Sequence, residues 1–217
     1  MKLCIITGGN IESSFVRDRL AEEHPDCILA ADHGLVFCRR EQIVPDYIVG
    51  DFDSTDPEIV RYYREDGSIP IDTYQPEKDF TDTDIAIQKA IALGADEVIL
   101  FGATGSRLDH TLSNIWNLSA FCREGIKACI EDPHNRITML PGREYRLRRD
   151  EQFGNRISLF PFGGTVEGLT LSGCRYPVTN ARLTWDNGGR FVSNEISDEV
   201  FCICWKSGVP ILMETRD

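Results

Sequence analysis

Two aspartates that could bind a metal ion follow a short apolar segment. The sequence Gly50-Asp51-Phe52-Asp53-Ser54 comes directly after Tyr47-Ile48-Val49, which is typical of a short buried strand. Because side chains alternate along a strand, the carboxylates of Asp51 and Asp53 should leave its carboxyl end on the same side. Mg²⁺ favours a few carboxylate oxygens together with phosphate oxygens and water. The spacing therefore predicts a metal site that could hold a phosphate-bearing ligand.

Turns and helix starts are the ordinary alternative for these two aspartates, because Asp is common in both. However, Asp56-Pro57 already has the pattern of a helix cap followed by proline at the first helical position. Since the capping role is filled there, we favour the metal interpretation for Asp51 and Asp53.

A second acidic segment, residues 77–84, runs into an amphipathic helical pattern. Asp82 and Asp84 should lie in the first turn of that helix, where acids complement the helix dipole and Thr81 can cap the end. This structural role competes with a role in a site. Lys78 adds a cation that could meet a phosphate if the helix terminus lies near Asp51.

A glycine-rich segment, residues 102–110, links an expected strand to the following helix. Its sequence is Gly102-Ala103-Thr104-Gly105-Ser106-Arg107-Leu108-Asp109-His110. The glycines permit close backbone approach, amides at the helix start can face an anion, and Arg107 offers a forked donor. The segment matches neither the Walker A pattern nor G-x-G-x-x-G. Asp109-His110 fits either a capping pair or part of a site.

The elements that must position these residues alternate between strand and helix patterns. Strands are expected at 3–7, 27–31, 47–49, 68–74, 97–101 and 127–131, and helices at 13–23, 35–40, 57–65, 82–93 and 108–123. This alternation predicts a parallel sheet with helices on both faces. Such sheets bind ligands beyond the carboxyl ends of their strands. Because Gly8-Gly9-Asn10 and Ala31-Asp32-His33-Gly34 also follow strands, all five segments should meet at one edge, which favours a catalytic site.

The sequence pattern changes after about Pro141, from alternating strands and helices to closely spaced strands. Short alternating segments lie at 144–148, 156–160, 165–171, 182–185, 200–206 and 210–214, separated by Gly, Pro and Asn. Closely spaced strands of this kind predict a small antiparallel sandwich or barrel. We therefore expect two domains, residues 1–140 and 141–217.

Composition limits the class of protein. The chain has 217 residues, 41% of them hydrophobic, which is enough for a sizeable core. A net charge of −12 argues against a nucleic-acid partner, which would require a basic surface. Between Glu41 and Asp84, thirteen Asp or Glu stand against three Lys or Arg, a density that suits divalent cations, although a solvated acidic surface is the usual meaning of such a run.

Location and redox state are also constrained. No segment has the apolar length of a signal peptide or a membrane span, so we expect a cytoplasmic protein with no membrane partner. The eight cysteines are scattered without C-x-x-C spacing, which favours free thiols over disulfides or zinc.

Four segments, in order along the chain, resemble motifs of the thiamine pyrophosphokinase family. They are Ala31-Asp32-His33-Gly34, Gly50-Asp51-Phe52-Asp53-Ser54, Lys78-Asp79-Phe80-Thr81-Asp82 and the glycine-rich segment at 102–110. Ser193-Asn194-Glu195 also resembles the S-N-E segment of bacterial members. The resemblance covers almost the whole chain. It implies an α/β fold in which a Rossmann-like, parallel-sheet, nucleotide-binding domain precedes a small all-β sandwich domain.

The resemblance also implies roles for individual residues. Magnesium binding and catalysis would fall to Asp51, Asp53 and Asp82. ATP, the co-substrate, would contact Asp32, Gly34, Lys78, Thr104, Gly105, Arg107 and Asp109. Of these, Asp32, Thr104, Arg107 and Asp109 would line the region of its phosphates. Ser193 and Asn194 would face thiamine, and the thiamine sites of a homodimer would use both subunits.

Some residues depart from the family pattern or fall outside it. His33 stands where glycine is usual in A-D-G-G, and residues 35–37 are less polar than usual. Trp185 and Trp205 could stack on the cationic or pyrimidine ring of thiamine, although a buried core position is the more common role for tryptophan.

The implied reaction is attack of the thiamine hydroxyl on the β-phosphorus of ATP, giving thiamine diphosphate and AMP. One alternative is a diphosphokinase for another hydroxymethyl heterocycle, such as a pterin, which the second domain would distinguish. Another is a nucleotide- or thiamine-sensing module without turnover, whose signature would be loss of the metal carboxylates. Asp51, Asp53 and Asp82 are all present, which favours an enzyme.

Overall fold

The computed structural model describes residues 1–53, 55–73 and 81–217 and separates them into two units, residues 1–133 and 134–217. The first unit contains a sheet of six strands in the order β4-β3-β2-β1-β5-β6, and every neighbouring pair is parallel. The strands are β1 Lys2–Ile6, β2 Cys27–Ala31, β3 Tyr47–Gly50, β4 Ile71–Thr73, β5 Glu97–Phe101 and β6 Lys127–Glu131. The predicted parallel sheet is confirmed.

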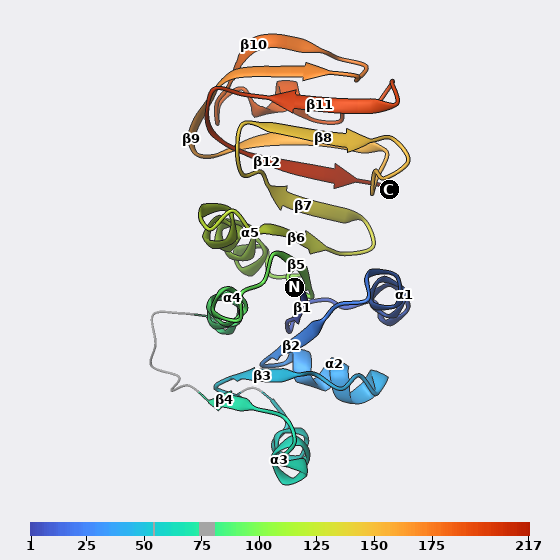
Figure 1. Ribbon diagram of the computed structural model, residues 1–217, viewed down its shortest axis with the longest axis vertical. Helices are drawn as coiled ribbons and strands as arrows, with labels where there is room; N and C mark the ends of the chain where they lie inside the picture. The colour runs from blue at the N-terminus through green and yellow to red at the C-terminus, as the bar shows by residue number, and fades with distance from the viewer. Residues whose placement is uncertain (54, 74–80) are drawn as a thin grey trace. The chain divides into compact units, whose positions relative to one another are not determined.

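Helices cover both faces of this sheet, as the alternating pattern predicted. They are α1 Ser13–Glu23, α2 Gly34–Glu41, α3 Pro57–Asp66, α4 Asp82–Ala92 and α5 Leu108–Arg123. Figure 1 shows α1 and α2 beside one face and α4 and α5 beside the other. Because strands buried on both sides need apolar residues throughout, the side chains of Leu3, Ile5, Leu29 and Leu100 are fully buried.

The strand order reverses direction between β1 and β5. From β1 the chain moves outward through β2, β3 and β4, and it then returns to place β5 on the other side of β1. At such a reversal the two connections leave in opposite directions, which opens a crevice at the carboxyl ends of the strands. The fold therefore favours a ligand site where β1 and β5 end.

The helix starts near this edge have the caps that the sequence predicted. Asp56 accepts a hydrogen bond from the Glu58 amide at 2.9 Å, with Pro57 at the first position of α3. Thr81 and Asp84 form a reciprocal capping box at the start of α4. Asp84 therefore serves as a helix cap. Asp82, in the same turn, is not part of this capping box.

The second unit contains six antiparallel strands and one short 3-10 helix. The strands are β7 Asn135–Met139, β8 Glu144–Arg148, β9 Arg156–Ser172, β10 Val178–Leu183, β11 Val200–Cys204 and β12 Ser207–Thr215, and the helix is Gly188–Phe191. Their order is β7-β12-β9-β11-β8, with β10 also paired to β9. All neighbouring pairs are antiparallel.

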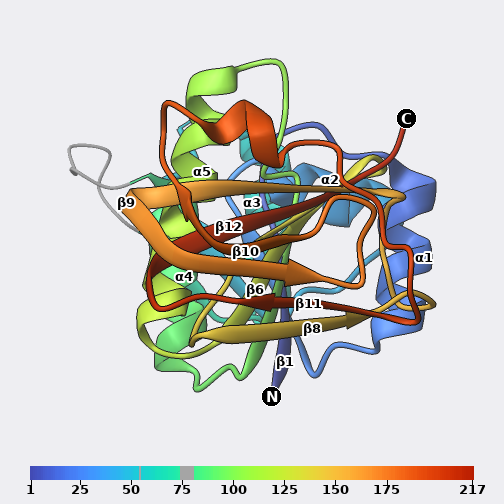
Figure 2. The ribbon, with the colours of Figure 1, turned by 90° about the horizontal axis from the view of Figure 1, so that it is seen from above.

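Two segments predicted as separate strands are one long strand in the structure. Residues 156–160 and 165–171 both belong to β9, which bends back on itself along its length (Figure 2). Its first half pairs with β12, and its second half pairs with β10 and β11. Gly163, between the two segments, adopts a positive φ of 66°, which glycine tolerates readily, so the strand turns there without ending.

The division between the units differs from the boundary predicted at 140/141. Residues 135–139 form β7, which pairs with β12, and the structure therefore assigns them to the second unit. This pairing joins segments at opposite ends of the unit's sequence, so local periodicity did not indicate it. The functional assignment of the two domains stays a prediction.

The core of the second unit contains one of the two tryptophans considered above. Trp205 is 4% exposed, and its Nε1–H donates to the Gly208 carbonyl oxygen at 3.2 Å. Along β11, buried Phe201 and Ile203 alternate with Cys202 and Cys204, as expected for a strand with one core face. All eight cysteines are thiols, as predicted.

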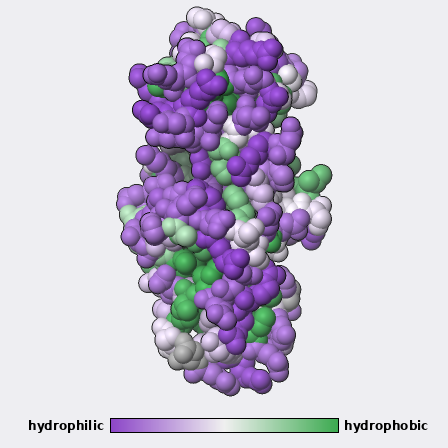
Figure 3. All heavy atoms as spheres, turned by 90° about the vertical axis from the view of Figure 1, so that its right-hand side faces the viewer, coloured by the Kyte–Doolittle hydropathy of each residue, from purple (hydrophilic) through white to green (hydrophobic). Residues whose placement is uncertain are grey.

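The surface agrees with the acidic, polar composition. Figure 3 shows a face that is mainly hydrophilic, with hydrophobic side chains confined to small groups. No helix in the described ranges has both the length and the apolarity needed to cross a membrane.

Candidate active site

Three aspartates from three different elements meet at the carboxyl edge of the first unit's sheet. Asp32 follows β2, Asp51 follows β3, and Asp82 begins α4. One carboxylate oxygen of each lies within 4.8 Å of the other two, and all three residues are partly buried. Strands β2 and β3 pair in register at Ala31 and Val49, so the residues after them emerge together. We call Asp32, Asp51 and Asp82 the acidic cluster.

The backbone at the acidic cluster is specialised. Asp32 adopts a φ of 43°, in the left-handed region that side chains other than glycine rarely occupy. Its amide donates to the Val49 carbonyl oxygen at 2.9 Å, and Thr55 Oγ1 donates to Asp32 Oδ1 at 3.0 Å. A Cβ on Gly50 would lie 3.2 Å from the Asp32 Cα, so glycine there allows β3 to pass close to Asp32. These contacts hold the Asp32 carboxylate in one place.

The acidic cluster is electrostatically crowded. Partial burial, followed by the negative charges of Asp32 and Asp51, raises the pKa of Asp82 to about 6. A divalent cation would offset the repulsion among the carboxylates. The donor atoms are carboxylate oxygens, which are the ligands that Mg²⁺ prefers. The residues therefore fit the predicted metal, with Asp32 as a member that the sequence analysis had assigned to the nucleotide.

Asp53, the remaining predicted metal ligand, lies beside the acidic cluster. Its side chain is exposed, and its amide donates to Asp51 Oδ1 at 3.1 Å, which helps orient Asp51. Its part in metal binding stays a prediction. Thr55, which orients Asp32, was missed because nothing local in the sequence distinguishes it from a loop residue.

A pocket of about 290 Å³ lies where β1 and β5 end, at the reversal of strand order. It is lined by Gly8–Asn10, by residues 102–107 and by His110, Thr111 and Asn114 of α5. We call it the glycine pocket. The predicted nucleotide residues Thr104, Gly105 and Arg107 all line it.

Hydrogen bonds from neighbouring elements fix the glycine-rich loop. The Gly102 carbonyl oxygen accepts from the Gly9 amide at 2.7 Å and from Thr7 Oγ1 at 2.6 Å. Asn114 Nδ2 donates to the Ala103 carbonyl oxygen at 2.8 Å. A Cβ on Gly9 would lie 2.2 Å from the Gly102 carbonyl oxygen, so only glycine permits this approach. The loop is therefore held in a defined shape before any ligand binds.

A second pocket, of about 300 Å³, connects the acidic cluster to the glycine pocket. Asp32 and Asp82 line it, together with Gly8 and His110, which line the glycine pocket as well. A phosphate chain could therefore reach from the glycine pocket to the acidic cluster. His110 was left undecided between capping and function, and the structure places it at this junction.

Arg107 and Asp109 pair with each other at the rim of the glycine pocket. Arg107 Nη2 lies 2.6 Å from Asp109 Oδ2, and this ion pair lowers the pKa of Asp109. Both side chains are exposed, so solvent screens the pair and makes it weak. Arg107 could exchange Asp109 for a phosphate. A nucleotide contact by Asp109 stays a prediction.

Gly34 and Lys78 are the remaining predicted nucleotide residues. Gly34 is buried at the start of α2, where an added Cβ would lie 2.0 Å from the Ile6 carbonyl oxygen, so its evident role is close helix packing. Lys78 lies outside the described residues.

The predicted thiamine residues belong to the second unit. Asn194 is 7% exposed, and its Oδ1 accepts from the amides of Tyr176 and Glu195 while its Nδ2 donates to the Tyr176 carbonyl oxygen. These bonds give the Asn194 side chain a structural role. Ser193 is exposed and has a φ of 58°. Contacts of either residue with thiamine stay predictions.

Trp185 differs from the core tryptophan Trp205. Its side chain is 90% exposed, between β10 and the short 3-10 helix. The common expectation of burial is therefore wrong for Trp185 and confirmed for Trp205. An indole this exposed can stack on a flat or cationic ring.

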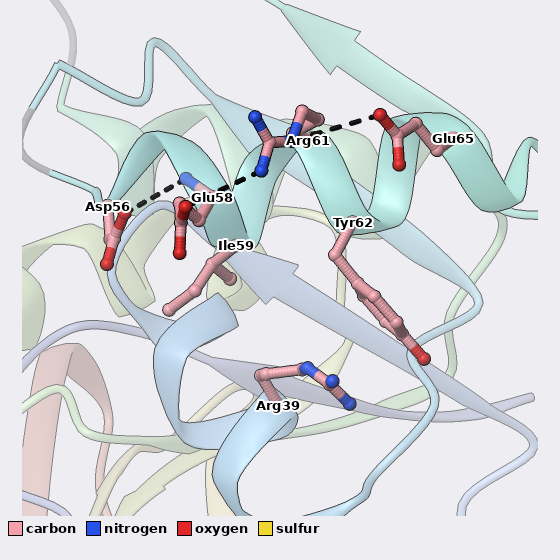
Figure 4. A pocket seen from close by; sticks show the side chains of 7 residues that line it. All are labelled: Arg39, Asp56, Glu58, Ile59, Arg61, Tyr62 and Glu65. Atoms are coloured by element: carbon pink, nitrogen blue, oxygen red, sulfur yellow. Dashed lines mark hydrogen bonds and ion pairs between the residues drawn. The ribbon is translucent and has the colours of Figure 1, made fainter.

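A further pocket, of about 350 Å³, lies between α2 and α3 and has a different character (Figure 4). Arg61 forms ion pairs with Glu58 and Glu65 of its own helix, and the Arg39 guanidinium lies 3.8 Å from the centre of the Tyr62 ring. Because these charges are engaged with one another, the pocket is a weaker candidate for ligand binding than the glycine pocket.

Two protein-family models match the sequence of this chain. The model described as "Thiamin pyrophosphokinase, catalytic domain" matches residues 19–130, and "Thiamin pyrophosphokinase, vitamin B1 binding domain" matches residues 144–209. The chain belongs to the thiamin pyrophosphokinase family. The catalytic-domain match includes all three members of the acidic cluster and the whole glycine-rich loop, and the vitamin B1 binding-domain match includes Trp185.

Individual relatives agree with the family assignment. Thiamine pyrophosphokinase from Bacillus subtilis (strain 168) is 34% identical over 189 residues, which cover 87% of each chain. Thiamine pyrophosphokinase 1 from Oryza sativa subsp. japonica is 26% identical over 212 residues, or 92% of this chain and 72% of the relative. The crystal structure of the Bacillus subtilis thiamine pyrophosphokinase superposes with a TM-score of 0.86 at 29% identity and full coverage of both chains. Thiamin pyrophosphokinases therefore share both sequence and fold with this chain.

Proposed function

We propose that this chain transfers diphosphate from ATP to thiamine. The thiamine hydroxyl oxygen forms a bond to the β-phosphorus, the bond from the β-phosphorus to the oxygen bridging to the α-phosphorus breaks, and thiamine diphosphate, AMP and a proton result. In this proposal the first unit is a Rossmann-like nucleotide domain and the second is a β-sandwich that binds thiamine.

One observation carries the proposal. In a chain of this family, the acidic cluster and the glycine pocket adjoin at the reversal of strand order. Gly8 and His110 line both the glycine pocket and the second pocket, which Asp32 and Asp82 also line. Phosphoryl transfer depends mainly on positioning and charge stabilisation, and this arrangement supplies anion-binding donors beside carboxylates that suit a cation.

The chain's own residues would divide the work. Arg107 and the amides at the start of α5 would bind phosphate oxygens, because a helix N-terminus and a guanidinium both favour anions. Asp32, Asp51 and Asp82, with Asp53 beside them, would hold Mg²⁺. The bound ion would neutralise negative charge that develops on the phosphate oxygens.

Thiamine recognition would fall to the second unit. The exposed indole of Trp185 would stack on a ring of thiamine, whose thiazolium is cationic. We further propose a cytoplasmic homodimer in which each thiamine site uses residues of both copies.

The two alternatives are weaker. A pterin acceptor does not explain the match of residues 144–209 to a vitamin B1 binding domain. A sensing module without turnover does not explain why three carboxylates converge beside the glycine pocket.

The direct test is incubation of the purified protein with thiamine, ATP and Mg²⁺, with chromatography of AMP and thiamine diphosphate from the same samples. Equal amounts of both products with thiamine, and none with a pterin alcohol, would support the proposal. Nucleotide binding without AMP would favour the sensor, and turnover with the pterin alone would replace the acceptor.

A further inference from the structure

A carboxylate behind the glycine pocket determines which way one hydroxyl group can hydrogen-bond. Thr104, which lines the pocket, donates from Oγ1 to Asp132 Oδ2 at 2.8 Å. Thr104 follows β5 and Asp132 follows β6, and these strands pair in register at Phe101 and Glu131. The contact therefore lies within the first unit and joins the ends of neighbouring strands.

The direction of this hydrogen bond is fixed by chemistry. A hydroxyl has one proton, and a carboxylate can only accept. Once Thr104 has donated to Asp132, its oxygen can only accept a hydrogen bond from a ligand. Phosphate oxygens are acceptors too, and the negative charge of Asp132 behind the hydroxyl repels them further. A phosphate is therefore disfavoured at Thr104.

Other residues that line the glycine pocket have the opposite character. Arg107 presents guanidinium donors there, and α5 begins at Leu108 with backbone amides that face anions favourably. The loop is fixed at Thr104, since the Thr104 carbonyl oxygen accepts from the Asn10 amide at 2.8 Å. The lining of the pocket thus offers an acceptor at Thr104 and donors at Arg107.

We propose that Thr104, positioned by Asp132, selects the nucleoside end of the nucleotide by accepting a hydrogen bond from a ribose hydroxyl or the base amine. The phosphates extend from there toward Arg107 and the acidic cluster. This inference rests on the proposed function for the presence of a nucleotide. It replaces the sequence-based expectation that Thr104 lines the phosphates.

Two small ligands separate the possibilities: AMP, which carries the nucleoside, and inorganic diphosphate with Mg²⁺, which does not. Their affinities are measured by titration calorimetry. Thr104→Val removes the hydroxyl with little change of shape, and it should weaken AMP binding about 3- to 10-fold while leaving diphosphate binding unchanged. Thr104→Ser keeps the hydroxyl and should bind AMP like the wild type. Equal weakening of both ligands by Thr104→Val, or no weakening of AMP, would overturn the proposal.

Analogues then identify the donor. Wild-type protein is titrated with 2′-deoxy-AMP, 3′-deoxy-AMP and inosine monophosphate, which each lack one candidate group. The analogue that lacks the donor should bind more weakly than AMP to the wild type, and the difference should disappear in Thr104→Val. If the wild type and Thr104→Val distinguish all three analogues from AMP equally, Thr104 contacts none of these groups and the proposal fails.

Asp132→Ala provides an independent variant that leaves Thr104 intact. It frees the hydroxyl to donate, so AMP should bind more weakly and the discrimination among analogues should diminish, whereas diphosphate should bind no more weakly than to the wild type. A purely structural role would weaken both ligands and lower the melting temperature. If the wild type turns over thiamine and ATP but the variants bind AMP as tightly as the wild type, this inference alone fails. The expected AMP effects without thiamine diphosphate formation would sink the proposed function alone.

Discussion

The two units use polar residues in different ways. At the carboxyl edge of the first unit, Asp32, Asp51 and Asp82 crowd together beside open pockets, and this crowding raises the pKa of Asp82 to about 6. In the second unit, the predicted ligand residue Asn194 is buried, and backbone groups satisfy its side chain. The most exposed large hydrophobic side chain there is the indole of Trp185. Acidic side chains that crowd together beside open pockets are a better sign of a ligand site than polar sequence motifs alone.

Loss of one carboxylate from the acidic cluster should have the largest effect. We expect Asp51→Asn to lower kcat by about 100-fold or more at saturating Mg²⁺, because charge stabilisation at the phosphates is removed. The measurement is the initial rate of AMP release. Asp18→Asn, which removes an exposed acid of α1, should stay within about 2-fold of the wild type. Near-normal turnover of Asp51→Asn would show that the acidic cluster of the first unit is not needed for catalysis.

Asn194 should affect stability more than chemistry. Asn194→Ala leaves partly buried backbone groups of Tyr176 and Glu195 without these partners, and we expect a loss of about 1–3 kcal/mol in the free energy of unfolding. Thermal and urea unfolding provide the measurement. Ser193→Ala, at the exposed neighbouring position, should change stability by less than about 0.5 kcal/mol. A wild-type melting temperature for Asn194→Ala, together with a large rise in the KM for thiamine, would show that Asn194 acts on the ligand.

Trp185 should show the reverse pattern. Because its side chain is 90% exposed, Trp185→Ala should leave stability unchanged. The KM for thiamine should rise by about 10-fold, since a stacked cation contributes about 1–2 kcal/mol when partly desolvated. Trp185→Phe should retain part of the effect. An unchanged KM in steady-state assays of both variants would leave the exposed indole without a role in thiamine binding.

The smallest expected effect concerns pH. The raised pKa of Asp82 means that the folded protein binds a proton more readily than the unfolded chain, whose value is near 3.8. Stability without metal should therefore fall as pH rises from about 4 through about 6. Asp82→Asn should stabilise the metal-free protein at pH 7.5 by on the order of 1 kcal/mol after allowance for solvent screening.

The comparison of wild type and Asp82→Asn at several pH values tests this prediction. The difference in melting temperature should shrink toward zero near pH 4. Addition of Mg²⁺ at pH 7.5 should stabilise the wild type more than Asp82→Asn, because the ion binds the folded acidic cluster. A difference independent of pH and Mg²⁺ would mean that Asp82 is not in electrostatic conflict with its neighbours.

Local patterns predicted most elements of the first unit. The limits of α1, β2, β5, α5 and β6 agree with the segments expected from periodicity, because each carries its own start, stop and apolar pattern. The strands of the second unit were harder to predict from local sequence patterns. Strand β7 was missed, and β9 was divided into two, since strand pairing there depends on partners far away in the sequence.

The sequence by itself determined the alternation of strands and helices and the carboxyl edge of the sheet at which the polar motifs meet. It also determined the residue types available for cation and phosphate chemistry. Only the tertiary structure decided which of those residues meet. It placed Asp32 with Asp51 and Asp82, gave Asp84 to a helix cap, buried Asn194 and exposed Trp185. The physical reason is that composition and spacing act along the chain, whereas charge crowding, burial and hydrogen-bond direction depend on strand order and register across it.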